Sequence, residues 1–151
     1  MKVSEIMTKD VVTVTPDTKV SAIARLMVEK AISGIPVVID SRVVGMVTEV
    51  DLVARNAHLH FPTFLQILDA RIYFESPRHF EEELRRMLGT TANDVMTTEV
   101  QTVKPDADVT DVATLMFEKK VNPVPVVENG KLVGIVSRTD IIRLLIQQEG
   151  F

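Results

Sequence analysis

The sequence predicts an α+β fold of two similar halves packed about a pseudo-twofold axis, and three observations lead to this prediction. An apolar strand runs directly into a helix twice, at residues 45–51 and 134–140. These stretches lie 89 positions apart, and four further pairs of segments keep that offset without a gap, which indicates an internal duplication. One half is marginal as a folding unit, so the two copies should pack together. The further pairs are Met7-Thr8 with Met96-Thr97, Pro16-Asp17 with Pro105-Asp106, Leu26-Met27 with Leu115-Met116, and Pro36–Val38 with Pro125–Val127.

Each half begins with a short helical turn, a β-branched strand and a helix. In the first half the turn is expected at Ser4–Met7 and the strand at Val11–Val14, where Pro16 ends it. The helix follows from apolar residues at helical spacing, and its methionine is expected in the core. The equivalents in the second half are Asn93–Met96, Val100–Val103 and Pro105. The helical apolar residues are Val20, Ile23, Ala24 and Met27, with their counterparts Val109, Val112, Ala113 and Met116.

Two strands and a second helix complete each half. The strands are expected at Pro36–Ile39 and Val43–Thr48, and again at Pro125–Val127 and Leu132–Ser137. Asn129-Gly130 is a strong signal for a two-residue hairpin. The helices run onward from Asp51 and Asp140, so each half has the order β-α-β-β-α.

The chain is expected to divide into repeat one at 1–55, a central segment at 56–91 and repeat two at 92–151. The central segment has no counterpart and is longer than a linker requires. Its apolar residues fit two helical faces, and Ser76-Pro77 would begin the second helix. We predict a helical hairpin. It would either cover the core or offer a surface for a partner or a second copy.

Composition excludes several classes of protein. Hydrophobic residues make up 46% and charged residues 25% of the 151 residues, a globular balance. The net charge of −4 argues against the basic footprint of a nucleic-acid binder. Without cysteine there is no disulfide framework and no thiolate. No apolar run approaches the ~20 residues that span a bilayer, and no signal peptide is evident, so a cytoplasmic location without membrane association is expected.

Thr48 with Asp51, and Ser137 with Asp140, place a hydroxyl and a carboxylate where a strand becomes a helix. One interpretation is a pair of capping boxes. The other is a ligand site, because a helix N-terminus attracts phosphate and a carboxylate can accept both hydroxyls of a ribose. The duplication favours the second interpretation.

Together with the Ile35-Pro36 and Val124-Pro125 pairs and the Met-Thr openings, these motifs resemble CBS domains, and the chain resembles a tandem CBS pair, or Bateman module. The resemblance covers about residues 3–52 and 92–142. It implies adenosine-containing ligands such as AMP, ADP, ATP, S-adenosylmethionine or NAD, in clefts between the repeats, with Mg²⁺ accompanying ATP. Asp51 and Asp140 would hold ribose and the apolar residues would sandwich adenine. One implied cleft contains Met46, Thr48, Asp51, Lys104, Asn122, Val124 and Pro125, and the other contains Ile135, Ser137, Arg138, Asp140, Thr15, Ser33, Ile35 and Pro36.

The two clefts are expected to differ in charge. Arg138 follows Ser137, whereas Glu49 follows Thr48, and a cation attracts phosphate where a carboxylate repels it. Lys104 would partly offset this difference in the Asp51 cleft. Because Ser33-Gly34 and Asn122-Pro123 carry no basic residue, the sequence favours AMP or a less charged adenosyl ligand over a triphosphate.

Competing functions find little support in the sequence. The usual nucleophile and base constellations of enzymes are missing, so catalysis is not expected. His58 and His60 point apart on a helix and His79 lies in another segment, so no metal site is expected. Only a few arginines of the central segment suggest nucleic-acid binding.

The sequence thus predicts a regulatory module that binds an adenosine nucleotide, forms a homodimer and signals occupancy to a regulated partner in the manner of an energy sensor. The alternative is a scaffold or interaction module that binds no ligand and associates through the central segment.

Overall fold

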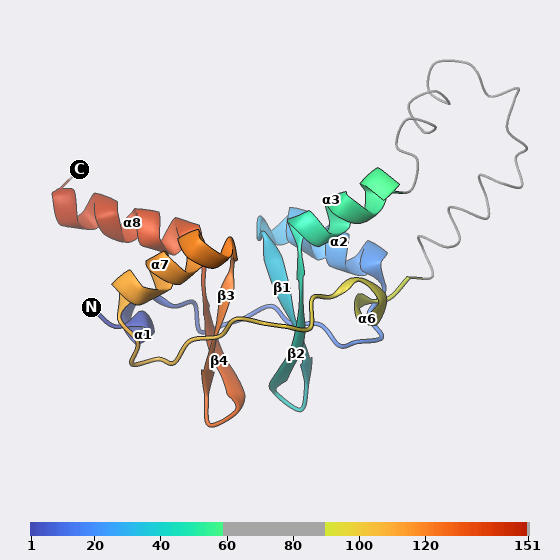
Figure 1. Cartoon of the computed structure of the whole chain (residues 1–151), viewed down its shortest axis with the longest axis horizontal. Helices are drawn as coiled ribbons and strands as arrows, with labels where there is room; N and C mark the ends of the chain where they lie inside the picture. The colour runs from blue at the N-terminus through green and yellow to red at the C-terminus, as the bar shows by residue number, and fades with distance from the viewer. Residues whose placement is uncertain (59–89, 151) are drawn as a thin grey trace, which may run out of the picture.

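The computed structural model describes residues 1–58 and 90–150, which form two α+β units side by side (Figure 1). The first contains α2 (Val20–Lys30), β1 (Gly34–Ile39), β2 (Arg42–Thr48) and α3 (Glu49–His58). The second contains α7 (Val109–Lys119), β3 (Val124–Glu128), β4 (Lys131–Val136) and α8 (Arg138–Glu149). The predicted α+β fold of two repeats is confirmed. The helical hairpin predicted for the central segment lies almost entirely outside the described residues.

Each unit is built around an antiparallel hairpin. β1 pairs with β2 from Gly34↔Thr48 to Ile39↔Arg42, and β3 pairs with β4 from Val124↔Val136 to Glu128↔Lys131. Asn129 and Gly130 both have positive φ, as a two-residue hairpin turn of the predicted kind requires. Asp40 and Ser41 adopt the same conformation in the first repeat, although no glycine signals a turn there.

The predicted first strand of each repeat is reduced to one parallel β-bridge. Val14 pairs with Val37 and Val103 pairs with Val126. Val14 accepts a hydrogen bond from Val38 at 2.9 Å and donates one to Pro36 at 3.1 Å, and the chain then turns away. Residues 9–13 form no bridge to either hairpin, whereas Thr8 pairs with Ile135 of β4 through two hydrogen bonds of 2.9 Å.

The short opening helices are exchanged between the repeats. α1 (Val3–Ile6) packs on the second unit, where the Val3 N–H donates to the Ala107 carbonyl at 2.9 Å. α6 (Ala92–Val95) packs on the first unit, where the Ala92 N–H donates to the Thr18 carbonyl at 2.8 Å. Figure 1 shows the blue α1 beside the orange and red elements and the yellow α6 beside the blue and cyan ones. The packed units therefore do not coincide with the sequence repeats.

The exchange joins two apolar cores. Val3 and Ala92 are both fully buried, each in the core of the other repeat. Met7 and Met96 lie so close to Gly134 and Gly45 that a Cβ on either glycine would come within 2.5 Å of the methionine sulfur. Met27 and Met116 are buried in the two cores, as predicted. Each core is therefore completed by a segment of the other repeat.

An exposed ion pair also links the exchanged segment to the second unit. The Lys2 ammonium lies 3.0 Å from an Asp108 carboxylate oxygen. This hydrogen bond and the charge of Asp108 raise the pKa of Lys2, and the same interactions lower the pKa of Asp108. Both groups are exposed, so the pair guides the register of the segment more than it stabilises the fold.

Candidate functional site

Thr48 and Ser137 cap α3 and α8 through reciprocal hydrogen bonds with the carboxylate three residues later. The Ser137 hydroxyl and backbone N–H donate to one oxygen of Asp140 at 2.8 and 2.7 Å. Thr48 donates to the equivalent oxygen of Asp51 at 3.0 and 2.8 Å. The capping-box interpretation is thus confirmed, and it occupies one carboxylate oxygen of each pair.

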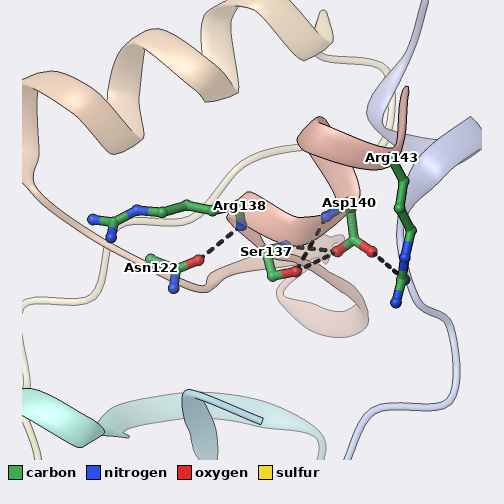
Figure 2. A network of polar contacts seen from close by, with 5 residues as sticks. All are labelled: Asn122, Ser137, Arg138, Asp140 and Arg143. Atoms are coloured by element: carbon green, nitrogen blue, oxygen red, sulfur yellow. Dashed lines mark hydrogen bonds and ion pairs between the residues drawn. The ribbon is translucent and has the colours of Figure 1, made fainter. Parts of the chain in front are cut away.

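The second oxygen of each carboxylate has a different partner in the two repeats. Asp51 Oδ1 accepts a hydrogen bond from the Thr97 hydroxyl at 3.1 Å. Asp140 Oδ1 lies 3.5 Å from a guanidinium nitrogen of Arg143, one turn along α8 (Figure 2). These oxygens are the acceptors that remain for a ribose. A ligand would compete with a neutral hydroxyl at Asp51 and with a guanidinium at Asp140.

Two cavities flank the pseudo-twofold axis, and both repeats line each of them. The Thr48 cavity, of about 280 Å³, brings together Met46, Thr48, Asp51 and Asn122. The Ser137 cavity, of about 350 Å³, brings together Ser33, Ile135, Ser137 and Asp140. Both volumes are close to the lower end of the range for small-molecule sites, about 300 Å³. Eight of the residues proposed from sequence thus meet in two groups.

Three residues lie on the wall that separates the cavities. Ser33, Glu49 and Pro123 line both of them. The side-chain amide of Asn122 donates to the Ser33 hydroxyl at 3.1 Å, so these two equivalent positions meet on the axis. Gly34 allows this approach, because a Cβ there would lie 2.5 Å from the ring of Pro123. The two cavities are therefore adjacent and share these side chains.

Six residues proposed from sequence lie outside both cavities. Ile35, Pro36, Val124 and Pro125 are buried, and their side chains pack in the sheet instead of facing a ligand. Thr15 bonds locally to Asp17 and Thr18. Lys104 lines a separate hollow with Lys2 and Ser4. Thr15 follows the cavity-lining residue Val12 by three positions. Three extended residues cover about 10 Å, so Thr15 lies beyond the cavity.

Arg138 lies in the opposite cavity from the one expected. It follows Ser137 in sequence, yet it lines the Thr48 cavity. Its backbone N–H donates to the Asn122 side-chain oxygen at 2.9 Å, and Figure 2 shows its side chain pointing away from Asp140 and Arg143. Successive helical residues are rotated by about a quarter of a turn or more, so neighbours can serve different sites.

The residues that follow the two Met-Thr dipeptides also line the cavities, which the sequence did not predict. Thr97, Glu99, Val100 and Gln101 line the Thr48 cavity, and the equivalent Thr8, Asp10, Val11 and Val12 line the Ser137 cavity. The duplicated Met-Thr dipeptides could have indicated that these residues belong to the candidate site. The residues after these dipeptides reach the cavities because the opening helices are exchanged and because Thr8 and Thr97 each bridge to the last strand of the other repeat, at Ile135 and Met46.

The two cavities have the same set of chemical groups. Each cavity offers a helix N-terminus, a carboxylate oxygen, a hydroxyl and apolar walls, which suit a sugar, an anion and a flat ring. The described residues contain no cluster of three metal-ligating side chains. Within the same residues, no helix is long and apolar enough to cross a membrane.

Comparison with known proteins agrees with this architecture. The CBS domain profile matches residues 3–58 and 92–147. The uncharacterized protein MJ1426 of Methanocaldococcus jannaschii is 34% identical, over 97% of this chain and 92% of its own. The chloroplastic CBS domain-containing protein CBSX2 of Arabidopsis thaliana is 30% identical, and the match spans 58% of its length.

A solved structure extends the likeness to three dimensions. The crystal structure of CBSX2 in complex with AMP has a TM-score of 0.73 and 28% identity, and the match covers 98% of both chains. The duplicated sequence, the two units with exchanged opening helices and these matches lead to one conclusion: the chain belongs to the CBS domain family and carries a tandem pair of such domains.

Proposed function

We propose that this chain is a regulatory module that binds an adenosine-containing ligand in the Thr48 and Ser137 cavities. The observation that carries the proposal is the pair of composite cavities, each with a capping hydroxyl and a carboxylate oxygen directed to it. The similarity to CBSX2, which was solved with AMP, indicates the class of ligand. No catalytic step is part of the proposal.

Each part of the ligand has a matching group. Ribose hydroxyls would donate to the second oxygen of Asp51 or Asp140. Adenine would lie on apolar residues, namely Met46, Val100 and Val121 in the Thr48 cavity and Val11, Val12, Ile32 and Ile135 in the Ser137 cavity. AMP, ADP and ATP share this recognition, and Mg²⁺ would enter only with ATP.

Occupancy would be signalled through the contact between repeats. In the Thr48 cavity a ribose competes with Thr97 for Asp51, and Thr97 also forms a two-way backbone bridge with Met46 at 2.9 and 3.0 Å. A ligand that contacts both repeats favours the arrangement in which those contacts are best, and this difference in affinity drives the response.

A thermal-shift and calorimetry panel of AMP, ADP, ATP, S-adenosylmethionine, NAD and GMP tests the proposal. An adenine compound at a hundred times its dissociation constant should stabilise the chain by about 2.7 kcal/mol, which raises the melting temperature measurably. GMP serves as the control for the base. If no adenosine compound binds, the hydroxyl–carboxylate pairs act only as helix caps.

A second candidate function is self-association through the outer helices. Val28 on α2 and Phe117 on α7 occupy equivalent positions and are 82% and 85% exposed. Val53 on α3 and Ile142 on α8 are a second equivalent pair, 68% and 54% exposed. The four helices lie on the side away from the hairpin turns (Figure 1). A pseudo-symmetric apolar face suits a second copy of the same chain.

We expect the wild-type chain to be a dimer and Phe117→Asp to be a monomer, measured by light scattering at several concentrations. A charge placed in an apolar interface must be desolvated, which weakens association. Thr110→Asp adds the same charge on the same helix near its N-terminus and should remain dimeric. A wild-type monomer at every concentration would rule this association out.

A further inference from the structure

The positions directly after the two capping hydroxyls carry opposite charges. Glu49 begins α3 and Arg138 begins α8, and the two residues are equivalent in the duplication. Most other charged groups of the cavities are matched. Asp51 and Asp140 are equivalent, as are Glu99 and Asp10, and each cavity has one lysine, Lys120 or Lys30. These matched groups cannot distinguish the cavities.

Each cavity has one further arginine, and the one in the Thr48 cavity is the one without an ion pair among the described residues. Arg138 lies there, although its sequence neighbours Ser137 and Asp140 line the other cavity. Its guanidinium forms no ion pair with any described residue. The hydrogen bond from its backbone to Asn122 fixes the start of its side chain at the cavity wall. This cation is therefore available to a ligand.

The arginine of the Ser137 cavity is engaged in an ion pair. Arg143 lines it and pairs with Asp140 at 3.5 Å, so its charge is partly neutralised. The first-repeat equivalent of Arg143 is Ala54, which carries no charge into the Thr48 cavity. Glu49 lines both cavities, and in the part of the chain that the structure describes only the Thr48 cavity also contains an arginine without an ion pair.

We propose that the Thr48 cavity takes the phosphorylated adenosine ligand, with Arg138 crossing from the second repeat to meet its phosphate, and that the Ser137 cavity takes an adenosyl ligand without phosphate. This inference rests on the proposed function. A guanidinium matches phosphate geometry and stays charged at all working pH values. In the Ser137 cavity Arg143 is paired with Asp140, so its charge offsets less of the repulsion between Glu49 and a phosphate.

The test compares AMP with adenosine, because the ratio of their affinities isolates the phosphate. Asp140→Ala removes binding in the Ser137 cavity, so calorimetry on this variant measures the Thr48 cavity alone. Asp51→Ala removes binding in the Thr48 cavity, so calorimetry on it measures the Ser137 cavity alone. We expect AMP to bind more tightly than adenosine in the first variant and no more tightly in the second. Adding Arg138→Gln to the first variant should lower the AMP affinity about tenfold or more and leave adenosine unchanged, since a hydrogen bond to a charged group is lost.

Arg143→Gln in the same Asp140→Ala background is the matched control. It removes an equal charge from the same helix, but on the side of the Ser137 cavity. The ratio of AMP affinity to adenosine affinity in the Thr48 cavity should therefore stay constant. Arg138→Gln in the otherwise unchanged chain repeats the measurement where the helix cap of α8 is intact. There too the AMP affinity should fall and that of adenosine should hold.

The outcomes separate the two proposals. If wild-type chain binds neither adenosine nor AMP, the proposed function fails. If both compounds bind but the ratio of AMP affinity to adenosine affinity is equal in Asp140→Ala and Asp51→Ala, only the assignment of phosphate to the Thr48 cavity is overturned. The same holds if Arg138→Gln leaves the AMP affinity unchanged.

Discussion

Asp51→Ala is expected to abolish adenosine-ligand binding in the Thr48 cavity while the chain still folds. The substitution removes both oxygens, the one that caps α3 and the one that faces Thr97. Two ribose hydrogen bonds to a carboxylate, at about 1.5 to 3 kcal/mol each, correspond to at least a hundredfold loss of affinity. Loss of the cap costs about 1 kcal/mol of stability. Calorimetry with AMP and urea unfolding measure the two effects separately.

Asp94→Ala is the control for the cap. Asp94 accepts hydrogen bonds from the Thr91 N–H and hydroxyl at 2.9 and 3.0 Å, the same arrangement as at Asp51, but it lines neither cavity. Asp94→Ala should lower the free energy of unfolding at least as much as Asp51→Ala does, and it should leave the AMP affinity unchanged. If Asp51→Ala binds AMP as the wild type does in the Thr48 cavity, the carboxylate there is a helix cap and nothing more.

Val3→Asp is expected to unfold the second unit first, although Val3 belongs to the first repeat in sequence. Val3 is fully buried in one cluster with Val112, Val124 and Val136. A carboxylate buried there without a partner costs several kcal/mol. Hydrogen exchange followed by mass spectrometry should show protection lost in β3, β4 and α7 before β1 and β2.

Ser4→Asp places the same charge one residue further along α1, where the side chain is exposed. A surface substitution of this kind should change stability by no more than about 0.5 kcal/mol. If Val3→Asp instead lowers protection mainly in β1 and β2, α1 would pack on its own repeat and the exchange would be absent in solution.

The opening helices show most clearly what the sequence could and could not reveal. Their existence followed from the duplicated Met-Thr segments, and the structure places them at α1 and α6. Their exchange did not follow, because a repeat pattern records which residues are equivalent and not which copy they pack against. Val3 and Ala92 would be buried in either arrangement.

The binding residues divide in the same way. Thr48, Asp51, Ser137 and Asp140 were identifiable because a hydroxyl three residues before a carboxylate has a fixed local geometry at a helix start. Ile35 and Val124, expected as cavity walls, are buried in the cores, since an apolar side chain next to a motif fits a core equally well. Thr97 and the valines after each Met-Thr dipeptide were missed because they reach the cavities only through contacts between repeats.

The sequence by itself determined the duplication, from the constant offset, and also the helix-strand-strand-helix order within each half and the two capping carboxylates, which depend on neighbours within a few residues. Only the tertiary structure decided which cavity each side chain serves. Arg138 shows why: its position on α8 is set locally, but the cavity it enters is set by the direction in which the helix leaves the sheet and by Asn122 across the axis from Ser33. That direction depends on packing between residues far apart in the chain, which no local pattern encodes.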